Sequence, residues 1–81
     1  SMKKPSPIKI TLNPVKKSSQ VHSIGYDPTS KTMAVKFNSG GVYHYHDVPQ
    51  EKFDAMRDAE SLGSHLGKHI KGAHKFTKLD A

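Results

Sequence analysis

Two strand-like segments joined by a pair of glycines constrain the fold more than any other part of this chain. In Thr32–Asn38 apolar side chains alternate with small or polar ones, and in Val42–Asp47 tyrosines alternate with valine and histidines. This period of two is typical of strands with one buried face and one wet face. Gly40 and Gly41 can adopt the positive φ of a tight connection. The sequence therefore predicts a β-hairpin.

A further strand is predicted before the hairpin, over Gln20–Tyr26. Val21 and Ile24 do not share a face of a regular strand, so burying both requires a bulge near Ser23 or Gly25. The Asp27–Ser30 stretch, with Pro28 at its second position, is typical of a turn. These segments predict an antiparallel meander of three strands: Gln20–Tyr26, Thr32–Asn38 and Val42–Asp47.

Two short helices are predicted after the meander. Pro49 suits a first helical position, and Phe53, Met56 and Ala59 recur at helical spacing. In the second helix Leu62, Leu66 and Ile70 share a face, Ser61 or Ser64 could cap its start, and Gly63 and Gly67 weaken it. We therefore expect an α+β fold, a three-stranded meander followed by two short helices packed on one face. The expected core is Val21, Ile24, Val35, Phe37, Tyr43, Tyr45, Val48, Phe53, Met56, Leu62, Leu66 and Ile70.

The N-terminal residues 1–14 are basic and rich in proline. Ile8, Ile10 and Leu12 alternate with polar residues, which predicts an extra edge strand. Such a strand could dock on its own sheet or exchange with a second copy to form a homodimer. Docking is favoured because it avoids the entropic cost of association. The expected organisation is an arm or edge strand at 1–14, a domain at 15–76 and a C-terminal tail at 77–81.

The bulk properties of the 81 residues limit what the domain can do. A chain this short buries only about 60% of the surface of its unfolded form, so a deep enclosed active site is not expected. Cysteine is absent, which fits a reducing cytoplasm, and no apolar run approaches the ~20 residues of a membrane span. We expect a cytoplasmic protein that does not bind membranes.

Charge is the strongest bulk signal, with 13 basic against 7 acidic residues and a net charge of +6. All the basic residues except Arg57 are lysines, which favour contacts to a phosphate backbone over base recognition. On a helix, the C-terminal lysines would form one stripe beside Phe76, and Lys36 would support them from the hairpin's wet face. The alternative is a solvated lysine face. The candidate nucleic-acid-binding residues are Lys68, Lys71, Lys75, Lys78 and Lys36.

Catalytic and metal-binding patterns are weaker. The Gly63–Lys68 stretch is one residue short of a phosphate-binding loop, and His69 stands where serine or threonine would hold magnesium. His44 and His46, like His65 and His69, have chelating spacing, but no cysteine or carboxylate completes either pair within its element. We therefore expect no enzyme, no cofactor and no metal.

Several short motifs of this chain occur together in one known family. They are Ser18-Ser19, Ile24-Gly25-Tyr26-Asp27, Met33-x-Val35-x-Phe37, Tyr43-x-Tyr45, Val48-Pro49, Ala59-x-Ser61-x-Gly63 and Ile70-Lys71. In this combination, spanning Val15 to Phe76, the chain resembles the KTSC domain, which occurs at the C-terminus of some lysyl-tRNA synthetases and in small free-standing bacterial and phage proteins. The resemblance implies a small α+β module, and the synthetase fusion implies RNA binding.

Two functions follow as expectations. The first is a non-catalytic module that binds the backbone of RNA or another nucleic acid through its lysines. The second is a protein–protein interaction module, in which the Ile8–Leu12 strand or an exposed sheet edge pairs with a partner chain or a second copy.

Overall fold

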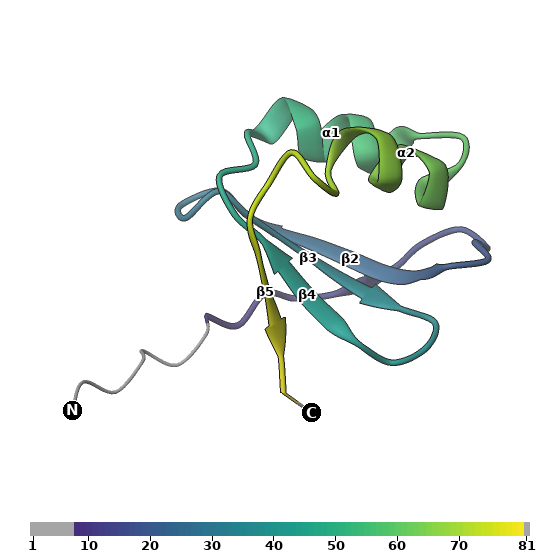
Figure 1. The fold of residues 1–81 in the computed structure, drawn as a ribbon, viewed down its shortest axis with the longest axis horizontal. Coiled ribbons are helices and arrows are strands. Elements are labelled where there is room, and N and C mark those ends of the chain that lie inside the picture. Colours follow the sequence, from purple (N-terminus) through teal and green to yellow (C-terminus); the bar gives the residue numbers. More distant parts are fainter. Residues whose placement is uncertain (1–7, 81) are drawn as a thin grey trace.

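A computed structural model of the protein describes residues 8–80. Its strands form one antiparallel sheet in the order β1-β2-β3-β4-β5, so each strand lies beside its neighbour in the sequence. Figure 1 shows both helices above the same face of this sheet. This confirms the predicted α+β class and the meander followed by two helices. The elements are β1 (Asn13–Pro14), β2 (Val21–Asp27), β3 (Thr32–Phe37), β4 (Val42–Tyr45), α1 (Gln50–Asp58), α2 (Leu62–His69) and β5 (Phe76–Leu79).

The predicted hairpin is present as β3 and β4. Val35 lies opposite Tyr43 and Met33 opposite Tyr45, so the buried face has the expected members. The turn closes with the Phe37 amide donating to the Gly41 carbonyl at 2.9 Å, and Gly40 has a φ of 104°. The two-residue periodicity of both arms was therefore enough to set the register.

The bulge predicted in the preceding strand is also present. The register of β2 against β3 shifts between Val21 and Ser23, which places the extra residue at His22 rather than at Gly25. The shift brings both Val21 and Ile24 onto the buried face, where they are 1% and 4% exposed. The bulge therefore allows this strand to contribute two side chains to the core.

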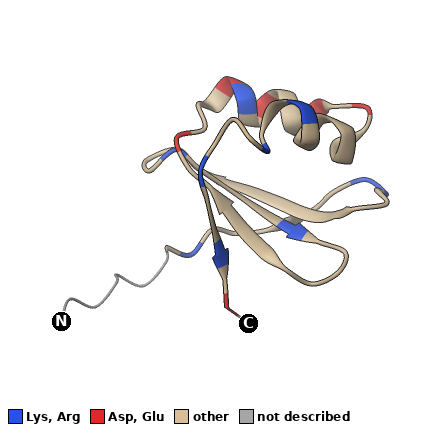
Figure 2. Cartoon of the chain, in the orientation of Figure 1, with Lys and Arg blue, Asp and Glu red and all other residues tan. Residues whose placement is uncertain are grey.

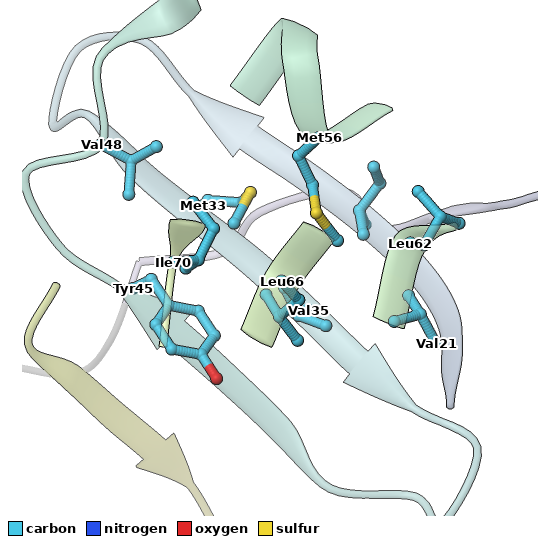
Figure 3. Packing of buried hydrophobic residues seen from close by; sticks show 10 residues of the cluster. Val21, Met33, Val35, Tyr45, Val48, Met56, Leu62, Leu66 and Ile70 are labelled. Atoms are coloured by element: carbon cyan, nitrogen blue, oxygen red, sulfur yellow. The ribbon is translucent and has the colours of Figure 1, made fainter. Parts of the chain in front are cut away.

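The core lies between the sheet and the two helices. Figure 3 shows Met56, Leu62 and Leu66 from the helices meeting Val21 and Met33 from the strands. Most of the predicted core is buried, and Met33 is a fully buried member that the prediction left out. Three predicted members are only partly buried and pack at the edge of the cluster: Phe37, Tyr43 and Phe53.

The C-terminal segment differs from the predicted helix and tail. Helix α2 begins after Ser61, whose hydroxyl oxygen accepts from the Ser64 amide, and it ends at His69. Gly72, with a φ of 82°, reverses the chain, and residues 76–79 then pair with β4 as strand β5. The predicted tail at 77–81 therefore contains most of an edge strand of the sheet.

The N-terminal segment docks on its own sheet, as favoured, but not through the predicted residues. Asn13 and Pro14 pair with Ile24 and Ser23, whereas residues 8–12 are not a strand. Ile10 and Thr11 instead lie across Gly25, where a Cβ would meet the Thr11 carbonyl oxygen at 2.0 Å. The close approach needs a residue without a side chain, and this fixes where the segment crosses β2.

Replacing Gly25 by alanine is expected to displace residues 10–11 and to lower the free energy of unfolding by about 1–3 kcal/mol, because the new methyl group overlaps backbone that cannot move aside as a side chain can. Thermal melting with proteolysis of the N-terminal segment would measure both effects. Gly67→Ala is the matched control, since a Cβ at Gly67 meets no atom within 4 Å. Equal melting temperatures for Gly25→Ala and the parent would contradict this account of the docking.

Candidate nucleic-acid interface

Four aromatic rings gather at the β5 edge of the sheet. The Tyr43 ring lies edge-on to Phe37 at 5.4 Å between centroids and stacks with Tyr45 at 6.3 Å. The Phe76 ring lies 5.4 Å from Tyr43 and 6.0 Å from Tyr45, tilted by 50° to both. One contiguous aromatic cluster therefore crosses three strands.

The strand register explains why these rings meet. Tyr45 lies opposite Phe76, and Tyr43 lies opposite Lys78. The three rings and the lysine therefore share the helix-facing side of the sheet. The helices do not extend over this edge. As a result Phe76, on the edge strand, is 58% exposed, whereas Tyr45, on the neighbouring strand β4, is 3% exposed.

An open pocket of about 420 Å³ lies over this cluster. Its lining combines the four rings with the turn that follows α2, and it contains no carboxylate, imidazole or thiol. We call it the aromatic pocket. It is lined by Phe37, Ser39, Tyr43, Tyr45, Lys71, Gly72 and Phe76.

Two lysine ammonium groups lie over rings of the aromatic cluster. Lys71 Nζ is 5.2 Å from the centroid of the Phe37 ring, and Lys78 Nζ is 5.9 Å from that of Tyr43. Both distances fall within the range of cation–π attraction. Such contacts position an ammonium group without neutralising it, so both charges stay available to an anion.

The four C-terminal lysines of the prediction do not lie on one helix. Lys68 lies on α2, Lys71 in the turn after it, Lys75 just before β5 and Lys78 on β5, and all four are exposed. The stripe expected on one helix is therefore wrong, because the helix ends at His69. Lys71 lines the aromatic pocket, and Lys78 lies beside it over the Tyr43 ring. Lys36 projects to the opposite face of the sheet from its neighbour Phe37 and does not line this pocket.

Charges of opposite sign separate along the chain. Residues 51–60 hold four of the seven acidic residues, whereas residues 61–79 hold lysines and no acid. Figure 2 shows the red segments along α1 and its connection to α2, and the blue segments along the path from α2 through β5. The segment that contributes Lys71 and Phe76 to the aromatic pocket is therefore basic until Asp80, which follows β5, and α1 carries both signs.

The prediction named the lysines as candidates but did not include the pocket that one of them, Lys71, lines. Phe37, Tyr43 and Tyr45 were expected in the core, and Phe76 was noted only as an aromatic residue among lysines. Residues 76–79 read Phe-Thr-Lys-Leu, in which apolar and polar side chains do not alternate, so no local pattern marked this strand. Only the pairing with β4 places Phe76 and Lys78 on one face.

The histidines do not gather into a metal site in the part of the chain that the structure describes, where no three His, Asp or Glu side chains come together. The His65 and His69 rings lie 4.4 Å apart on α2. Burial, with smaller contributions from His69 and Lys52, lowers the pKa of His65 below its usual value. His44 is 5% exposed, and burial, followed by the nearby His46, lowers the pKa of its imidazole.

The lowered pKa values of His44 and His65 predict that the protein loses stability on acidification. The unfolded chain takes up protons near the usual histidine pKa of about 6.5, whereas the folded chain resists protonation at His44 and His65. The free energy of unfolding should therefore be steady above that pKa and fall as the pH drops below it. Urea unfolding at several pH values would measure this, and His44→Gln should make the fall shallower. A fall just as steep in that variant would assign the dependence to other groups.

Comparison with known proteins agrees with this fold. The KTSC domain profile matches residues 17–76. An uncharacterised protein of Stutzerimonas stutzeri is 39% identical over 64 residues, covering 78% of this chain and 90% of that protein. A KTSC domain protein of Yersinia pestis has a crystal structure that superposes with a TM-score of 0.84 at 32% identity, covering 89% of this chain and all of that one.

A larger relative contains the same region. A lysine–tRNA ligase of Nostoc punctiforme is 36% identical over 61 residues, which is 75% of this chain and 11% of the ligase. The fold is thus that of a small α+β domain that is found both alone and within a much longer enzyme. The chain belongs to the KTSC domain family. Across residues 8–80 the structure has no helix long and apolar enough to cross a membrane.

Proposed function

We propose that this domain is a non-catalytic module that binds single-stranded RNA, mainly through phosphate contacts from Lys68, Lys71, Lys75 and Lys78. The observation that carries the proposal is the acid-free, lysine-bearing segment 61–79, from which Lys71, Gly72 and Phe76 line an exposed aromatic pocket. Basic surfaces interleaved with aromatic side chains are typical of sites that follow a nucleic-acid strand. The Nostoc relative adds support, since its name states a tRNA substrate.

Binding through this surface should depend little on sequence. Lysine presents a compact charge without the planar fork that recognises guanine. The one arginine, Arg57, lies on α1 and is engaged by Asp58 at 2.9 Å and by Asp54 at 3.4 Å. The groups left at the candidate interface attract a backbone rather than distinguish bases.

A salt titration tests the proposal. If four lysines each neutralise one phosphate of a single strand, log K should fall against log salt with a slope of roughly −3, at about −0.7 per contact. The measurement is fluorescence anisotropy of a labelled short RNA and of mixed tRNA. No binding to either at about 50 mM salt, where such contacts are strongest, would overturn the proposal.

A second candidate function is strand addition by a partner protein or a second copy. It is favoured by β5, which pairs only with β4 in residues 8–80 and therefore presents one free edge. Sedimentation over a range of concentrations distinguishes the two functions. The backbones of Lys75 and Thr77 face β4, so the amide of Lys78 faces the free edge. Self-association of the parent that Lys78→Pro abolishes, together with absence of RNA binding by the parent, would support the interaction module.

A further inference from the structure

We propose that the aromatic pocket receives one unstacked base of the RNA strand, with Phe76 as the stacking surface and Lys71 and Lys78 holding phosphates on either side of that base. This inference rests on the proposed function and deepens it, because backbone contacts alone would not require the pocket. It predicts that the domain distinguishes single strands from duplexes.

Phe76 is the most exposed ring of the aromatic cluster. Its ring is 58% exposed, although Tyr43 and Tyr45 contact it from the sheet side. Those two neighbours pack against the ring from one direction, and its exposed fraction shows that the remaining surface is uncovered. A ring held in place with one side uncovered can stack on a base with little loss of its own conformational entropy.

The tyrosines are less suited to this role. Tyr45 is 3% exposed and belongs to the core, and Tyr43 is half-buried between Phe37 and Phe76. Burial raises the pKa of Tyr45, with a smaller contribution from Tyr43, as expected for a phenol that is largely withdrawn from water. Phe76 is therefore the ring of the cluster with free surface for a base.

Lys71 and Lys78 place two positive charges beside the aromatic cluster. Lys71 comes from the turn after α2 and lies over Phe37, whereas Lys78 comes from β5 and lies over Tyr43. Two cations thus stand at different rings of one aromatic surface, and within residues 8–80 neither forms an ion pair with an acid. In a nucleotide strand, bases with π-faces alternate with negatively charged phosphates. The bases can stack on the rings while the phosphates approach the two ammonium groups.

The aromatic pocket suits an unpaired base better than a base in a duplex. A base in a duplex is paired and stacked on both faces, so it cannot enter a pocket whose floor is a ring. An unpaired base can stack there without that cost, and stacking tolerates any base because every base has a π-face. The geometry therefore favours an unpaired nucleotide over a duplex.

Replacing Phe76 by leucine separates stacking from charge. Leucine keeps an apolar side chain on β5 but has no π-face, so affinity for a short oligouridylate should fall between about 5-fold and 160-fold, which corresponds to the loss of one stacked base. The salt slope should stay unchanged because the lysines remain. Phe76→Tyr should restore affinity. The parent should bind the oligouridylate more tightly than an RNA duplex of equal charge, and Phe76→Leu should not change binding to inorganic polyphosphate.

These measurements distinguish failure of the base-binding site from failure of RNA binding as a whole. Equal affinity of parent and Phe76→Leu for oligouridylate would overturn the pocket inference while leaving backbone binding intact. Equal loss of polyphosphate binding in Phe76→Leu would also overturn it, since the substitution would then act through the lysines or the fold. Failure of the parent to bind any RNA would overturn the proposed function itself. Concentration-dependent dimers that Phe76→Leu dissociates would assign the pocket to a second copy and overturn the base-binding site.

Discussion

Replacing Leu66 by alanine is expected to lower the free energy of unfolding by about 2–5 kcal/mol, which is a large part of the stability of a domain this small. Leu66 is fully buried between α2 and the sheet. Helix α2 has eight residues, two of them glycines, so it has little intrinsic stability and depends on this packing. Loss of the side chain leaves a cavity and also weakens the attachment of the helix.

Chemical denaturation of Leu66→Ala against the parent measures the effect. Lys68→Ala on the same helix is the control, because Lys68 is exposed and alanine is the better helix former. Phe37→Ala should cost less than Leu66→Ala, since Phe37 is only partly buried at the margin of the core. A Leu66→Ala variant as stable as the parent would contradict the described packing of α2.

Changing Lys68, Lys71, Lys75 and Lys78 together to glutamine should weaken binding to single-stranded RNA by about two to three orders of magnitude at about 0.1 M salt. The reason is the loss of four phosphate contacts and of the counterions that each one releases. The salt slope of the residual binding should approach zero. Anisotropy titrations at several salt concentrations give both quantities.

The matched control removes the same charge from other surfaces. It is the variant Lys9→Gln, Lys17→Gln, Lys31→Gln and Lys36→Gln, which keeps the aromatic pocket and its lysines. Lys16 is left intact because its ammonium group donates to the Ala59 carbonyl. We expect the control to keep most of the slope and affinity. Equal losses in both variants would mean that net charge, rather than the surface at the pocket, governs binding.

Local periodicity was sufficient to predict the hairpin and the helices. Met33, Val35 and Phe37 alternate over a segment long enough to define a strand, and Leu62, Leu66 and Ile70 recur at helical spacing. The bulge in β2 could also be predicted, because burying Val21 and Ile24 together demands it. Each of these inferences depends on neighbours within a few residues.

Strand β5 and the aromatic pocket could not be predicted from local patterns in the same way. Lys68, Lys71, Lys75 and Lys78 have helical spacing by coincidence, and Phe76–Leu79 lacks the apolar–polar alternation that would indicate a strand. The strand forms because Gly72 reverses the chain and β4 offers a free edge. Phe76 meets Tyr45 only through that pairing, so a site built across β3, β4 and β5 has no signature in any single segment.

The N-terminal segment illustrates a related limit. Alternation in Ile8–Leu12 indicated a strand, but it carried no information on which residues of β2 it would meet. The steric requirement at Gly25 places Ile10 and Thr11 across the sheet, and the pairing moves to Asn13 and Pro14. Contacts between distant segments, rather than the local pattern, decided the outcome.

The measurement that tests the central claim most directly is an amide chemical-shift titration of the isotope-labelled domain with a short single-stranded RNA. The largest shifts should fall on Lys71, Gly72, Phe76, Lys78 and their neighbour Tyr43, with smaller shifts at Lys68 and Lys75 and none on α1 and β1. Shifts that are spread evenly over all lysines, or are centred on α1 or β1, would contradict a site at the aromatic pocket. An unchanged spectrum at saturating RNA would contradict RNA binding altogether.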